Sequence, residues 1–217
     1  MKTDMQLKDD VTAELAWTTG VDAAGIGVAV KDGIVTLSGT LATFAEKHLA
    51  EAAVRRVAGV RGVALDLEVQ LAPGHKRNDS EVAQAAVNAL NWSVLVPHER
   101  VKVQVENGWV TLSGEVDWGY QQVACEQCVR PLIGVRGVIN DIVVKPHALP
   151  RDLRDQIAAA LERHAEREAK HIQIEVDGGV VTLKGVVHSL RERDAAVGTV
   201  GAAKGVSRVV DRLEVVA

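Results

Sequence analysis

The sequence predicts an α+β fold made of three tandem αββαβ units, each a small three-stranded mixed sheet with two helices on one face. The first observation is an internal repeat: the string DGIVTLSG at 32–39 returns as NGWVTLSG at 107–114 and as GGVVTLKG at 178–185. The copies are offset by 75 and 71 residues, and each offset holds across the whole unit without a gap. Such a fixed register indicates three copies of one structural unit.

The second observation is the hydrophobic periodicity around each string. Leu7, Val11 and Leu15 are spaced by four, which is typical of an amphipathic helix, and the same places in the other copies hold Val82, Ala86 and Leu90, then Leu153, Ile157 and Leu161. Alternating apolar residues follow and predict a half-buried strand, at Ile26, Val28 and Val30 in the first copy, Val101, Val103 and Val105 in the second, and Ile172, Ile174 and Val176 in the third.

Each alternating run ends in a turn signal. The pairs are Asp32-Gly33, Asn107-Gly108 and Gly178-Gly179, and they predict a hairpin because both central residues of a type I′ turn need positive φ. A second strand follows the turn. We then expect a second helix over roughly 43–57, 118–132 and 189–203, and a third strand after the glycines at 59, 134 and 205.

Proline-containing linkers separate the copies, at 72–79 and 146–152. We therefore divide the chain into unit 1 (1–72), unit 2 (73–146) and unit 3 (147–217). A unit of about 70 residues is near the lower limit for a self-sufficient hydrophobic core. We expect the units to pack on one another or on a second chain.

Composition narrows the possible functions. Of the 217 residues 47% are hydrophobic and 25% charged, as in a globular protein, and the net charge of −4 divides among the units as −3, −1 and 0. Because no unit is basic, a nucleic-acid partner is disfavoured, and so is a simple electrostatic attraction to an anionic membrane. The first thirty residues lack the apolar run of a secretory signal, so we expect a cytoplasmic protein.

The G-x-V-T-L-S-G string, the helix after it and the GV-x-x-V entry to the last strand resemble the BON domain family, named after bacterial osmotically inducible and nodulation proteins. The resemblance covers nearly the whole chain and is weaker in unit 3, where Lys184 replaces the serine. It implies a non-enzymatic module that binds phospholipid and is linked to osmotic or envelope stress. It also implies periplasmic or envelope association as an alternative location. A lesser implication is potassium binding, known for BON domains fused to a LysM module; no LysM module is evident here.

Residue types that could carry chemistry do not recur between copies. Cys125 and Cys128 form a CxxC motif, but the same positions are Ala50 and Ala53 in unit 1 and Ala196 and Thr199 in unit 3, which favours small residues at a packed helix face over a redox or zinc site. His164, Glu168 and His171 could share a helix face, yet a solvated charged face is the favoured interpretation. Ser38 and Ser113 have no recurrent base. We therefore predict no enzyme, no cofactor and no metal.

The aromatic residues are the remaining candidates. Trp17 and Trp92 occupy matching positions at the end of the first helix, and we expect them to be core anchors. Trp109 should lie on the sheet face opposite the helices, because Val110 and Leu112 face them. Trp118 and Tyr120 occur only in unit 2, near the start of its second helix, and suit a membrane interface, a protein hot spot or a seam between units.

We therefore predict a non-catalytic, stress-associated protein that contacts a phospholipid membrane surface through Trp118, Tyr120 and Trp109. The alternative is a protein-interaction scaffold or homo-oligomer without lipid affinity, built through apolar residues on the open sheet faces.

Overall fold

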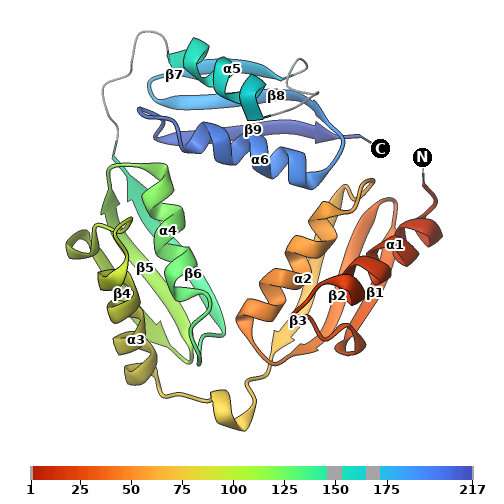
Figure 1. The fold of residues 1–217 in the computed structure, drawn as a ribbon, viewed down its shortest axis with the longest axis vertical. Helices are drawn as coiled ribbons and strands as arrows, with labels where there is room; N and C mark the ends of the chain where they lie inside the picture. Colours follow the sequence, from red (N-terminus) through yellow and green to blue (C-terminus); the bar gives the residue numbers. More distant parts are fainter. Residues whose placement is uncertain (1, 146–152, 165–171, 217) are drawn as a thin grey trace.

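The computed structural model describes residues 2–145, 153–164 and 172–216 (Figure 1). The predicted αββαβ order is confirmed in all three units. Unit 1 contains α1 (Asp4–Trp17), β1 (Ile26–Lys31), β2 (Ile34–Leu41), α2 (Phe44–Arg56) and β3 (Gly62–Val69). Unit 2 contains α3 (Asp79–Trp92), β4 (Val101–Glu106), β5 (Trp109–Val116), α4 (Gly119–Val129) and β6 (Gly137–Val144). Unit 3 contains α5 (Leu153–His164), β7 (Gln173–Asp177), β8 (Val180–Val187), α6 (Leu190–Gly201) and β9 (Arg208–Val215).

Each unit holds one mixed sheet with its second strand in the middle. In unit 1, β1 pairs antiparallel with β2 and β3 pairs parallel with β2, and the other two sheets repeat this order. The predicted turns are confirmed by their backbone angles, since Asp32 and Asn107 have φ of 53° and 51°. The glycine late in the second strand is also required: a Cβ on Gly39 would lie 2.1 Å from the carbonyl oxygen of Gly25.

In units 1 and 2 the first helix is tied to the hairpin through its own first turn. The carboxylate of Asp4 accepts hydrogen bonds from the backbone N–H groups of Asp32 and Gly33, at 2.8 and 3.1 Å. Asp79 does the same for Asn107 and Gly108 in unit 2. An acidic residue in the first turn also suits the positive end of the helix dipole. One side chain thus fixes the angle between helix and sheet.

The cores lie between the helices and one sheet face. Val35 and Leu37 of β2 are completely buried against Leu7, Val11 and Leu15 of α1, and the equivalent residues form the cores of units 2 and 3. The apolar stripe read from the first helix of each unit is therefore part of the core.

The three units occupy the corners of a triangle (Figure 1). The second helices α2, α4 and α6 face its centre, while α1, α3 and α5 lie farther out. Unit 3 meets unit 1 where Val215 of β9 packs against the core of unit 1. The units therefore pack on one another, and the chain forms a closed ring of three similar parts.

Candidate functional site: the interfaces around the ring

Equivalent residues form each of the three interfaces. Phe44 begins α2 and packs against the core of unit 2, and Leu190 begins α6 and is buried in the core of unit 1. These residues share one position in the repeat, which Gly119 occupies in unit 2. Each unit therefore contacts the next in the same head-to-tail manner, and this type of contact produces a ring when the rotation closes.

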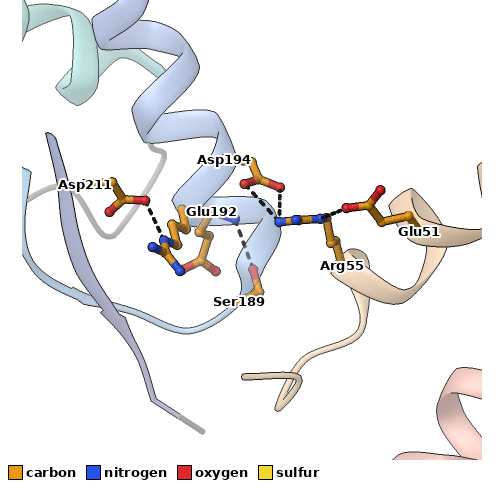
Figure 2. Close-up of polar contacts among 7 residues, drawn as sticks. Glu51, Arg55, Ser189, Glu192, Asp194 and Asp211 are labelled. Carbon is orange, nitrogen blue, oxygen red and sulfur yellow. Dashed lines mark hydrogen bonds and ion pairs between the residues drawn. The ribbon is translucent and has the colours of Figure 1, made fainter. Parts of the chain in front are cut away.

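Polar contacts stabilise two of these interfaces at a second pair of equivalent positions. Between units 3 and 1, the guanidinium of Arg55 bonds the carboxylate of Asp194 at 3.2 and 3.3 Å, and Glu51 holds the same guanidinium at 3.0 Å from its own helix (Figure 2). Because both side chains of the interface pair are partly exposed, the pair is worth about 0.2–1 kcal/mol.

Between units 1 and 2, the equivalent contact joins Arg130 and His48. Nη1 of Arg130 lies 2.7 Å from Nε2 of His48, and Glu126 pairs with the same guanidinium. Arginine only donates, so His48 accepts at Nε2 in its neutral form. Burial, and then the charge of Arg130, lower the pKa of His48 below its usual 6.5. Both polar contacts line one cleft of about 690 Å³ between the inner helices.

The interface between units 2 and 3 is apolar instead. Val123 occupies the position of His48 and Asp194, and Gly201 occupies the position of Arg55 and Arg130. A groove of about 1080 Å³ opens here. Its lining is mostly aliphatic, with Leu95, Val123, Ile142 and Val143 from unit 2 and Val180, Val197, Val206 and Val209 from unit 3.

Exposed apolar side chains flank this groove on unit 2. Trp92, the last residue of α3, is 89% exposed, and Val94 and Leu95 in the segment that follows are 100% and 57% exposed. We call these three residues the apolar loop. Leu95 also lines the groove, so the apolar loop reaches the groove through this side chain.

The prediction that Trp17 and Trp92 are core anchors is wrong. Trp17 is 84% exposed, as exposed as its counterpart in unit 2. The buried stripe of α1 ends at Leu15, and a residue two positions later lies about 200° around an α-helix. Both indoles therefore point to solvent, and the recurrence of tryptophan at this position does not reflect core packing.

The three predicted contact residues do not form one surface. Tyr120 is 42% exposed and lines the groove. Trp118 is half-buried and immediately precedes α4. At the equivalent position in the other units, the hydroxyl oxygens of Thr43 and Ser189 accept a hydrogen bond from the first turn of the helix. An indole N–H only donates, so Trp118 cannot replace these caps. Trp109 lies on the open sheet face, as expected, and its ring covers Gly137, where a Cβ would come within 2.4 Å.

The two cysteines pack against the core of unit 2. Cys125 is completely buried, and burial raises the pKa of its thiol to about 11, so the thiolate is scarce at neutral pH. Cys128 is partly buried against the same cluster. This confirms the packed helix face that the small residues at equivalent positions predict.

The described residues hold no cluster of three histidine, cysteine or acidic side chains that suits a metal ion. Of the histidine and glutamate residues considered for a metal in unit 3, Glu168 and His171 lie outside the described residues. The lysine that replaces the serine in unit 3 has a structural partner, since Nζ of Lys184 lies 2.7 Å from the carboxylate of Glu175 on the neighbouring strand.

Comparison with known proteins agrees with this repeated architecture. A family model described as BON domain matches residues 3–70, 78–146 and 151–217. The chain belongs to the BON domain family. It is 30% identical over 117 residues to an uncharacterized protein in the gshII 5′ region of Anaplasma centrale, covering 51% of this chain and 78% of that protein. It is 29% identical over 147 residues to osmotically-inducible protein Y of Escherichia coli (strain K12), covering 65% of this chain and 73% of that protein.

A solved structure, the C-terminal domain of CdsD from the type III secretion system of Chlamydia trachomatis, aligns over the full length of both chains with 14% identity and a TM-score of 0.27, which is too low to support an argument. In the part of this BON protein that the structure describes, no helix is both long and apolar enough to cross a bilayer.

The groove was not found by sequence reasoning. Its signal is nevertheless present in the sequence, because three positions that are polar in the other copies become Val123, Val197 and Gly201 where units 2 and 3 meet. What the repeat pattern lacks is the information that these three positions face one another.

Proposed function

We propose that this BON protein is a non-catalytic, stress-associated protein that binds phospholipid membrane surfaces through unit 2. The apolar loop carries the proposal, because it places a tryptophan and two aliphatic side chains in solvent within four residues. Trp suits the interface between headgroups and hydrocarbon, and aliphatic residues suit the hydrocarbon beneath it. The BON family and the name of the osmotically-inducible relative support the link with stress.

The expected affinity comes from apolar burial rather than from charge. Fully burying a valine or leucine side chain contributes about 1.5–3 kcal/mol, so Val94 and Leu95 together supply several kcal/mol on insertion. Tyr120 lies close enough to line the same groove as Leu95 and extends the contact. With a net charge of −4, the chain should bind with little dependence on salt.

Flotation of the protein with vesicles of neutral or anionic phospholipid, at low and moderate salt, tests the proposal. We expect the wild type to float and a Val94→Asp/Leu95→Asp variant to stay with the soluble fraction. A Trp118→Ala/Tyr120→Ala variant should float less well. Trp17→Ala is the control for loss of an exposed tryptophan outside unit 2, and it should float like the wild type. The proposal is wrong if the wild type fails to float with any vesicle, or if the apolar-loop variant floats as well as the wild type.

Self-association through the open sheet faces is the second candidate, and a specific feature favours it. Ile34 and Trp109 occupy equivalent positions on β2 and β5 and are each about half exposed. A molecular mass that rises with concentration, and that falls to the monomer value in Ile34→Ser/Trp109→Ser, would support this function. A constant monomer mass would exclude it.

A further inference from the structure

The interface between units 2 and 3 differs from the other two at every position that makes a polar contact elsewhere. In units 1 and 2 a glutamate holds the interface arginine from four residues before it, but unit 3 has Val197 and Gly201 at these places. The residue that meets the arginine is His48 or Asp194 at the other interfaces and Val123 here. Three polar positions from two units have thus become apolar or small at the same interface.

The apolar side chain that packs into the next unit is also missing at this interface. Where Phe44 and Leu190 reach into the next unit, unit 2 has Gly119, and a Cβ there would lie 2.5 Å from the carbonyl oxygen of Gly201. The two inner helices therefore meet through their backbones at this point, and no side chain extends from it into unit 3. The aliphatic walls beside this contact form the groove.

The groove has a single charged lining residue among those described, and it is a cation. Arg208 begins β9 and is exposed, and its guanidinium makes no hydrogen bond or ion pair with another described residue. A guanidinium binds carboxylate and phosphate oxygens with two parallel hydrogen bonds. An aliphatic groove with one unpaired arginine fits a molecule that is apolar along its length and anionic at one end.

Continuity with the apolar loop selects the source of that molecule. Leu95 belongs both to the apolar loop and to the groove lining, so the groove opens where the loop meets the membrane under the function proposed above. We propose that the groove between units 2 and 3 binds one acyl chain of an anionic phospholipid, with Arg208 on its phosphate. This site rests on the proposed membrane function and defines its lipid preference.

Gly198 gives a clean way to fill the groove. It lies on α6 and lines the groove, and a Cβ added there meets no atom within 4 Å. Because glycine weakens a helix interior, replacing it should not destabilise the fold. Gly198→Phe therefore blocks the groove, and Gly198→Ala is the matched control with the same backbone change and little added volume.

The test is calorimetric titration of the full chain with dioctanoyl phosphatidylglycerol below the concentration at which it forms micelles. We expect the wild type and Gly198→Ala to bind equally and Gly198→Phe to bind at least about tenfold more weakly. Arg208→Gln should lose about tenfold for the phosphatidylglycerol and less for dioctanoyl phosphatidylcholine, whose choline cation already compensates its phosphate, so the preference between the two lipids should shrink. Equal binding by Gly198→Phe and the wild type, or an unchanged preference in Arg208→Gln, overturns the proposal. Octanoate binding as tightly as the phospholipid also overturns it, because the site would then be one for free fatty acids.

Vesicle flotation of the same variants separates this site from the proposed function. If Gly198→Phe still floats but loses the monomeric lipid, both proposals stand, because the apolar loop binds the surface and the groove binds the chain. If the wild type binds the monomeric lipid but never floats, the groove site stands and the membrane-surface function fails. If the wild type floats but does not bind the monomeric lipid, the groove site fails and the surface function stands.

Discussion

Leu190→Ala should open the ring between units 3 and 1 without unfolding either unit. Leu190 is only 4% exposed, but it belongs to the core of unit 1 although it begins a helix of unit 3. Truncating a buried leucine costs about 2–5 kcal/mol. We expect a value near the lower end, about 2 kcal/mol, because the interface can separate instead of keeping a cavity.

The ion pair beside this leucine adds little to the interface. Arg55 and Asp194 are partly exposed, so their contact contributes about 0.2–1 kcal/mol. Val215 of β9 also packs against the core of unit 1, so Leu190→Ala weakens this interface more than loss of the ion pair does but leaves that contact. Leu190→Ala/Asp194→Asn should weaken the interface further.

The assay is small-angle X-ray scattering well below the melting temperature, followed by differential scanning calorimetry. We expect Leu190→Ala to raise the radius of gyration and to separate the unfolding of units 1 and 3. Leu183→Ala is the matched control, because Leu183 is fully buried within unit 3 and makes its contacts there. It should melt unit 3 earlier and leave the low-temperature scattering unchanged. Identical scattering for Leu190→Ala and the wild type would refute the assignment of this residue to ring closure.

Three further predictions concern single side chains. Gly198→Ala should raise the free energy of unfolding by about 0.5–1 kcal/mol, seen as a melting temperature higher by about 1–4 °C, since the added methyl group meets no neighbour. The pKa of His48 in the folded protein lies below 6.5, so as the pH falls the unfolded chain takes up a proton at this histidine before the folded protein does. The contribution of neutral His48 to the free energy of unfolding is therefore complete above pH 6.5 and is lost as the pH falls from 6.5 to the folded pKa. His48→Gln can still accept from Arg130 and should flatten this part of the pH profile of denaturant unfolding; an unchanged profile would contradict the role of His48. The Cys125 thiol, with a pKa of about 11, should react with a thiol reagent at pH 7 only as fast as unit 2 unfolds, and an immediate reaction would contradict its burial.

Local sequence rules predicted the fold because each rule concerns residues close together in the chain. Asp32 and Gly33 specify a hairpin by their own backbone preferences, and Val11 follows from helical spacing. The repeat strengthened each prediction, because the same pattern occurs at the equivalent residues of three copies. The same reasoning failed for Trp17 and Trp92, where recurrence of residue type was given more weight than the angle around the helix.

The candidate site was predicted only in part, because it depends on how the units meet. Tyr120 was found from its restriction to unit 2, and it does line the groove. The groove itself arises from Val123 of one unit and Val197 and Gly201 of the next, which are far apart in sequence. Periodicity within a unit contains no information on this contact. Val94 and Leu95 of the apolar loop were missed because they lie between a helix and a strand, where no periodic pattern draws attention to them.

Hydrogen–deuterium exchange of the wild type with and without vesicles of anionic phospholipid tests the central claim most directly. If unit 2 contacts the bilayer and the groove takes an acyl chain, protection should rise in the peptides that contain Trp92 to Leu95, the amino-terminal half of α4, and α6 near Gly198. Protection confined to the open sheet faces around Ile34 and Trp109, or no change anywhere while the protein is bound to vesicles, would contradict it.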